Sequence, residues 1–228
     1  MRKLKNYLAF IKRFIFEALG IRPALNGLDR KLEKYLDFDN GFFIEAGAND
    51  GYCQSNTYYF EKNRDWKGVL VEGIPELYER CKKKRPNSKT YNFALVSPTF
   101  QLTTVTMHYA NLMSVVDGSL KSKERQQEHI DAGVDIQNLK GTYSVIVQAR
   151  TLESILDEEE DILTIDLFSL DVEGCELEVL EGLNLSRYRP TFILVEARYF
   201  EEIDVFLLNH DYVFIERLSH HDVLYRAK

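Results

Sequence analysis

The sequence contains few cysteines, the residues on which small disulfide-linked domains and zinc knuckles depend. Its 228 residues include three cysteines, Cys53, Cys81 and Cys175, which lie far apart and form no C-x-x-C pair. This spacing argues against a disulfide framework and against a zinc knuckle, and it fits a reducing cytoplasm. No segment reaches the roughly 20 apolar residues that cross a bilayer. No linker or internal repeat marks a second domain, so we expect a cytoplasmic protein, soluble or peripheral, with one main domain.

Charge is unevenly distributed along the chain. The 29 Lys and Arg against 36 Asp and Glu give a net charge of −7, but residues 1–35 carry nine basic and three acidic side chains, which leaves −13 for the rest. A body this acidic repels phosphate backbones, so we expect no nucleic-acid partner. The hydrophobic content of 45% is typical of a folded globular chain.

Residues 1–40 form a separate N-terminal segment in which an amphipathic basic helix is expected. On a helix its apolar side chains share one stripe and its basic side chains lie elsewhere. The stripe consists of Leu4, Leu8, Ile11, Ile15 and Ala18. Two roles stay open: contact with an anionic membrane at its inner surface, or packing on the chain's own domain or on a second copy. A second short helix is expected at 25–36.

From residue 41 onward, short apolar runs alternate with helical stretches. Strands are expected at 42–46, 69–72, 90–96, 168–172 and 192–196, and helices at 55–63, 75–84, 176–183 and 200–209. This alternation predicts an α/β domain over 41–228, with a mostly parallel sheet and helices on both faces. The runs 212–217 and 222–225 predict a C-terminal antiparallel hairpin. Because Glu45, Glu72, Asp171 and Glu196 each end a strand, we expect them to converge on one crevice.

An insertion at 99–150 interrupts the alternation. Strands are expected at 102–109 and 143–149, and the polar stretch 119–133 is expected to be a helix or a mobile loop. Such an insertion on the ligand side of a sheet would carry the acceptor pocket. Asn111 and Ser114 are our candidate substrate contacts there, together with Glu196 from the sheet edge.

The most specific stretch is residues 42–51, FFIEAGANDG, an apolar strand that opens into a loop containing Gly47 and Gly51. Glycines allow a tight turn and close backbone approach to a ligand, and the next helix offers free N–H groups to an anion. The middle glycine of G-x-G-x-x-G is missing, so an amino-acid carboxylate fits better than a pyrophosphate. Glu45 could then pair with an α-ammonium group.

Glu72 strengthens this interpretation, because a carboxylate at the end of the second strand can accept both hydroxyls of a ribose. The loop, Glu72, the residues 92–94 and the final hairpin together resemble the Rossmann-like class I S-adenosylmethionine-dependent methyltransferase fold. With LDVEGCE at 170–176 and ILVE at 193–196, the chain resembles the FkbM methyltransferase family over roughly 41–200. Members of that family mostly O-methylate sugars and related natural products.

The resemblance implies S-adenosylmethionine as cofactor and assigns residues to its parts. The methionine part would be held by Glu45, Gly47, Asn49, Asp50 and Gly51, the ribose by Glu72, and the adenine side by Asn92 and Ala94. Two features depart from the family: Glu45 stands where Asp is more usual, and the N-terminal basic helix lies outside the family domain. The implied activity is transfer of a methyl group to a hydroxyl of a sugar or glycan.

Methyl transfer to an alcohol is helped by a nearby group that takes the hydroxyl proton. Our candidates are Asp171, Glu173 and, in the insertion, His108. The alternatives are a ligand-orienting or helix-capping role for Asp171, and a structural role for His108. Asp171, Glu173 and Glu196 could instead hold Mg²⁺, but their spacing does not separate this from a metal-free site, so no metal ligand is assigned.

Two other functions stay open. The chain could methylate a nitrogen or a carboxylate of another small molecule. It could also be a membrane-peripheral or assembly protein that uses a methyltransferase-like domain as a scaffold. The basic helix would then be its binding surface. A nicotinamide-dependent dehydrogenase is disfavoured by the missing glycine and by the final hairpin.

Overall fold

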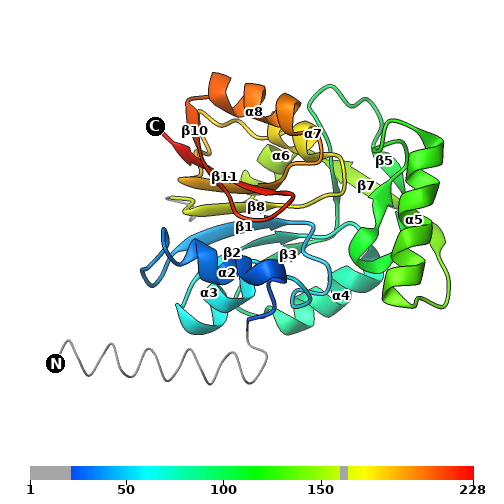
Figure 1. The fold of residues 1–228 in the computed structure, drawn as a ribbon, viewed down its shortest axis with the longest axis horizontal. Helices are drawn as coiled ribbons and strands as arrows, with labels where there is room; N and C mark the ends of the chain where they lie inside the picture. The colour runs from blue at the N-terminus through cyan, green and yellow to red at the C-terminus, as the bar shows by residue number, and fades with distance from the viewer. Residues whose placement is uncertain (1–21, 160–163) are drawn as a thin grey trace.

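In a computed structural model, which describes residues 22–159 and 164–228, the chain folds around a seven-stranded sheet (Figure 1). The strand order is β10-β11-β9-β8-β1-β2-β3. Their bounds are β1 Phe42–Ala46, β2 Lys67–Val71, β3 Lys89–Tyr91, β8 Leu167–Leu170, β9 Phe192–Glu196, β10 Tyr212–Arg217 and β11 Asp222–Ala227. β11 runs antiparallel to β9 and β10, and the other neighbours are parallel. The predicted fold class is therefore confirmed, including the C-terminal hairpin.

The strand register aligns the carboxyl ends. Ala46 of β1 lies opposite both Val71 of β2 and Leu170 of β8, and Leu170 lies opposite Val195 of β9. The residues that follow these positions therefore leave the sheet side by side. They are Gly47, Glu72, Asp171 and Glu196.

Helices cover both faces of the sheet, as Figure 1 shows. Strand side chains alternate between the faces, so Phe43 and Leu70 pack with α2 Leu28–Leu32, α3 Tyr58–Asn63 and α4 Pro75–Lys84. Ile44 and Val69 pack on the opposite face with α6 Leu152–Leu156, α7 Glu176–Glu181 and α8 Phe200–Asn209. The continuous apolar strands are thus buried on both sides, as parallel strands usually are.

The insertion and the preceding strand β4 form a small second sheet in the order β4-β7-β5-β6. The strands of this sheet are β4 Ala94–Leu95, β5 Thr104–Tyr109, β6 Val115–Val116 and β7 Tyr143–Arg150, and the insertion also carries the 3₁₀ turn η2 Asn111–Met113. The helix α5 Lys123–Gln137 begins within the stretch 119–133, for which a helix or a loop was expected, and extends beyond it. Ser122 caps it by accepting a hydrogen bond from the Arg125 N–H.

Several predicted elements differ in extent by a few residues, and two of these differences have a visible cause. The single strand expected at 90–96 is divided between β3 and β4, which belong to different sheets. Between them the Asn92 side-chain amide donates to the carbonyls of Glu72 and Gly73. The helix expected from residue 55 begins only at Tyr58, because the preceding turn binds the Glu45 carboxylate.

The segment before the sheet packs into the same core. The 3₁₀ turn η1 Leu25–Gly27 leads into α2, and Leu28, Leu32 and Leu36 are buried beneath the sheet. The predicted amphipathic helix of residues 1–20 lies outside the described residues. Among the helices of the described ranges, none is both long and apolar enough to span a bilayer.

Candidate active site

A cavity of about 560 Å³ lies at the carboxyl ends of the parallel strands. Its walls come from the loop after β1, from the ends of β2, β8 and β9, and from η2 and α5 of the insertion. Of the predicted site residues it brings together Glu45, Gly47, Asn49, Glu72, Ala94, Asn111, Ser114, Asp171, Glu173 and Glu196. Carboxylates from four strand ends therefore share one enclosed space with the insertion.

The loop after β1 is held close to the ends of β2 and β8 by its backbone conformation. Gly47 has φ +82°, and its N–H donates to the carbonyl of Val71, as does that of Ala48. A Cβ atom on Gly47 would lie 1.7 Å from the carbonyl oxygen of Asp171. Asn49 also adopts positive φ, at 47°. The strands β1 and β8 can therefore approach closely here only with glycine at position 47.

Asp50 and Gly51 shape this loop from behind the cavity wall. The Asp50 carboxylate accepts hydrogen bonds from the N–H groups of Tyr52 and Cys53 and pairs with Lys84. Burial opposes ionisation, but these partners outweigh it and lower the pKa of Asp50. Neither residue lines the cavity, so their predicted contact with a cofactor stays a prediction.

Glu45 lines the cavity, but its carboxylate is bound to the turn before α3. It accepts hydrogen bonds from Ser55 Oγ, the Asn56 N–H and Thr57 Oγ1, at 2.7–3.0 Å. Arg85 Nη1 lies 3.3 Å from Glu45 Oε2. The guanidinium of Arg85 thus supplies the positive charge that Glu45 was predicted to find in an α-ammonium group.

Glu72 faces the cavity from the end of β2. Its two carboxylate oxygens accept from the N–H of Asn49 at 2.7 Å and from the N–H of Ile74 at 2.8 Å. Burial raises the pKa of Glu72 to about 7, although these backbone hydrogen bonds oppose the shift. Asn92 does not line the cavity but fixes the backbone of Glu72 from the outside, whereas Phe93, Ala94 and Leu95 form an apolar wall beside it.

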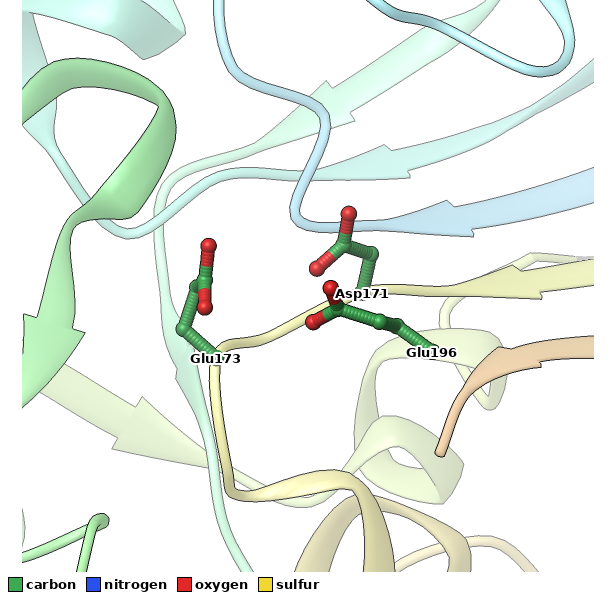
Figure 2. Close-up of side chains that lie close together, drawn as sticks. All are labelled: Asp171, Glu173 and Glu196. Carbon is green, nitrogen blue, oxygen red and sulfur yellow. The ribbon is translucent and has the colours of Figure 1, made fainter. Parts of the chain in front are cut away.

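Asp171, Glu173 and Glu196 form a three-carboxylate cluster in this cavity. Each presents an oxygen atom, and the three atoms lie within 4.8 Å of one another. Figure 2 shows Asp171 and Glu173 on the segment that follows β8, with Glu196 reaching toward them from the end of β9. Within the described residues this is the group with the geometry to hold a metal ion.

The cluster concentrates negative charge between the cavity walls. Asp171 is exposed toward the cavity, whereas Glu173 and Glu196 are partly buried. Desolvation by the surrounding walls raises the pKa of Asp171 well above the ordinary value, with Glu196 and Glu173 adding repulsion. Desolvation and Glu196 raise the pKa of Glu173 to about 8, against the opposing guanidinium of Arg198. Arg198 pairs with Glu173 and lies 3.9 Å from Glu196.

The insertion supplies the wall opposite the cluster. Asn111 lies near Asn49, and Ser114 Oγ is engaged with the backbone of Ala110 and Asn111. His108 does not line the cavity: on β5 its ring nitrogens contact Ser144 Oγ and Asp117. The structure thus brings Asn111 and Ser114 to the cavity and leaves His108 outside it.

Sequence reasoning missed three side chains that shape the site: Arg85, His129 and Arg198. His129 lies on α5, lines the cavity, and has Nε2 3.4 Å from Glu173 Oε2. Burial and Arg198 lower the pKa of His129 to about 4, against a hydrogen bond to the backbone of Met113. A signal for His129 existed, because the helix buries Gln126, Ile130 and Gly133 on the same side. Nothing local in the sequence distinguishes the two arginines.

Comparison with known proteins identifies one family. The family model described as "Methyltransferase FkbM domain" matches residues 45–214. No curated protein matches the sequence.

Solved structures resemble this chain at low sequence identity. A TehB-like SAM-dependent methyltransferase from Corynebacterium glutamicum is 10% identical, with 98% of this chain and 97% of that chain covered and a TM-score of 0.43. A SAM-dependent methyltransferase from Aquifex aeolicus is 10% identical, with 87% and 88% covered and a TM-score of 0.43. One from Geobacter sulfurreducens in complex with S-adenosyl-L-homocysteine is 9% identical, with 86% and 67% covered and a TM-score of 0.41.

Proposed function

This chain belongs to the FkbM methyltransferase family, and we propose that it transfers a methyl group from S-adenosylmethionine to a hydroxyl of a sugar or glycan. The observation that carries the proposal is the single cavity in which the glycine loop and Glu72 face the three-carboxylate cluster. One side of this cavity suits a nucleoside with an amino-acid tail. The other suits a polyhydroxylated acceptor.

The donor side has a different chemistry for each part of the cofactor. Glu72 offers carboxylate oxygens to ribose hydroxyls, and the wall of Phe93, Ala94 and Leu95 is apolar enough to face an adenine ring. The loop residues Gly47, Ala48 and Asn49 line the cavity and can face the amino-acid end. When bound, S-adenosylmethionine supplies an electrophilic methyl group on a positively charged sulfur. The acidic surroundings of Asp171 favour such a cation.

The acceptor side can hold and deprotonate a hydroxyl group. Three carboxylates within 4.8 Å of one another can accept hydrogen bonds from neighbouring hydroxyls, as sugars present them. A carboxylate with a raised pKa is also matched to taking a proton near neutral pH. Asp171 follows the central strand β8 and is our first choice for this role, with Glu173 as the alternative.

Calorimetry with S-adenosylhomocysteine tests the donor side. We expect the full chain to bind it and Glu72→Ala to lose binding at least tenfold, because the ribose hydroxyls lose their acceptor. Glu76→Ala, on the exposed side of α4, is the matched control and should bind as the wild type does. No heat and no thermal shift from the wild-type chain would overturn the donor assignment.

Turnover with a panel of free monosaccharides and oligosaccharides tests the acceptor side, with S-adenosylhomocysteine release as the signal. Asp171→Asn should slow methyl transfer by about a hundredfold or more, the usual contribution of a positioned proton acceptor. Its affinity for S-adenosylhomocysteine should stay within about threefold of wild type. Asp131→Asn, on the exposed side of α5, is the control. Methylation of amines or carboxylic acids but of no sugar would refute the proposed acceptor.

A further inference from the structure

The three-carboxylate cluster carries more negative charge than the described side chains around it compensate. When ionised, Asp171, Glu173 and Glu196 contribute −3, and Arg198, which contacts two of them, contributes +1. The formal balance of these four side chains is −2. Three carboxylates held this close repel one another, which is costly unless a cation or protons compensate their charge.

The spacing of the cluster matches the ligand sphere of one ion. Around a small hard cation, neighbouring ligand oxygens lie about 3 Å apart and opposite ones about 4 Å apart. The three carboxylate atoms lie within 4.8 Å of one another, so small side-chain movements suffice to bring them onto one ion. In Figure 2 the three carboxyl groups border a common space.

A buried residue behind the cluster holds two of its members in place. Glu176, at the start of α7, has no exposed surface and accepts hydrogen bonds from the N–H groups of Val172 and Gly174 through Oε1. These amides flank Glu173, whose backbone has φ +56°. The segment that carries Asp171 and Glu173 is therefore fixed before any ligand arrives.

His129 supplies an independent observation that points to a ligand. Its side chain is 9% exposed, it lines the cavity, and its Nε2 atom has no hydrogen-bond partner, although it lies 3.4 Å from Glu173 Oε2. The ring bonds to the backbone of Met113, and Nε2 remains without a hydrogen-bond partner beside the cluster. A water or hydroxyl ligand of a cation bound to Glu173 would supply the hydrogen that Nε2 lacks.

We propose that Asp171, Glu173 and Glu196 bind one hard divalent cation of the Mg²⁺ or Mn²⁺ class, and that His129 accepts a hydrogen bond from a water or hydroxyl ligand of that ion. Oxygen ligands select this class of metal. Cation binding itself does not depend on the acceptor. Its role, which rests on the proposed function, is to orient two neighbouring sugar hydroxyls and to make one of them more acidic. The proton of that hydroxyl passes to the carboxylate oxygen of Asp171 that does not bind the ion.

Electron paramagnetic resonance of Mn²⁺ with the chelator-treated full chain tests the site. We expect one Mn²⁺ bound per chain and displaced by excess Mg²⁺. Glu196→Gln and Asp171→Asn should each weaken binding at least tenfold. Glu178→Gln removes an exposed carboxylate of α7 and is the matched control, with binding unchanged. Circular dichroism establishes which variants fold, and either cluster variant alone is sufficient.

A wild-type chain that retains no Mn²⁺ at millimolar concentration would overturn the cation site, as would a folded Glu196→Gln that binds as tightly as Glu178→Gln. Calorimetry with S-adenosylhomocysteine in the presence of a chelator keeps this result separate from the proposed function. Cofactor binding without Mn²⁺ binding overturns the cation site alone. Mn²⁺ binding without cofactor binding supports the cation site and overturns the donor assignment.

Discussion

Gly47 sits where β1 passes into the loop that faces the cavity. The carbonyl group of Asp171 occupies the space where a Cβ atom of residue 47 would lie. The position therefore combines positive φ with a lack of space for any side chain. Glycine-loop spacing in the sequence predicts a close backbone approach here. That approach turns out to involve the chain's own β8 as well as the cavity.

Replacing Gly47 by alanine should therefore destabilise the fold by about 3 kcal/mol or more, from backbone strain plus the clash with Asp171. Gly118→Ala is the matched control, because Gly118 has φ +86° and nothing within 4 Å of an added Cβ. That variant should lose only about 1 kcal/mol. Urea unfolding of both variants measures the difference, and equal losses would contradict the steric explanation.

Glu45 illustrates what a residue's position in the sequence leaves open. Its place at the end of a strand predicts that it reaches the crevice, and it lines the cavity. Its main partners are Ser55, Thr57 and Arg85, which the fold brings from up to 40 positions away. A carboxylate's partner depends on which opposite charge packs nearest, and no local pattern encodes that.

Arg85, directly after α4, connects the helix α3, the strand β1 and the loop after β1. It has no exposed surface, and its guanidinium donates to Glu61 of α3 at 2.7 Å, to Glu45 of β1 and to the carbonyl of Gly51. The loop that faces the cavity is thereby tied to the helices beneath it.

Arg85→Met should destabilise the protein by about 3–5 kcal/mol, because Glu45 would remain buried without its cation and Glu61 would keep only Lys62. Arg80→Ala, in the same helix, breaks an exposed pair with Glu76 and should cost less than about 0.5 kcal/mol. Thermal and urea unfolding provide the comparison. If Arg85→Met unfolds with the Arg80→Ala midpoint, the network does not stabilise the loop.

At the scale of elements, strong apolar runs were the most predictable. β1, α4, β9 and α8 have the expected bounds. In these segments the spacing of the apolar residues directly reflects burial on a sheet face or along one side of a helix. The strand expected at 90–96 was wrong as a single element. There the Asn92 amide binds carbonyls of the neighbouring β2 segment and turns the chain into a second sheet.

At the scale of the whole molecule, burial makes several carboxyl groups hard to ionise. Glu72 is the simplest of them to test. Its pKa is about 7 in the folded chain against an ordinary value of 4.5. Between these values the folded chain keeps a proton that the unfolded chain has released, so the free energy of unfolding falls as pH rises. His129, with its lowered pKa, acts in the opposite direction below pH 6.5.

Glu72→Gln removes the contribution of Glu72 to the pH dependence of stability and leaves that of His129. The stability of the wild type relative to this variant should therefore decline between pH 4.5 and 7, by up to about 3 kcal/mol. Urea unfolding at several pH values measures it, and Glu76→Gln should show the wild-type dependence. A difference between wild type and Glu72→Gln that rises with pH would contradict the buried state of this carboxyl.

The sequence by itself determined the α/β class, the succession of the main strands along the chain, the C-terminal hairpin and the position of four acids at strand ends. These follow from periodicity and from the rule that parallel strands share one carboxyl edge. Only the tertiary structure decided that Arg85 neutralises Glu45, that His108 stays outside the cavity, and that His129 and Arg198 meet Glu173. Contacts between segments far apart in the chain depend on how the helices and the insertion pack on the sheet. Such side-chain packing leaves no periodic pattern in the sequence.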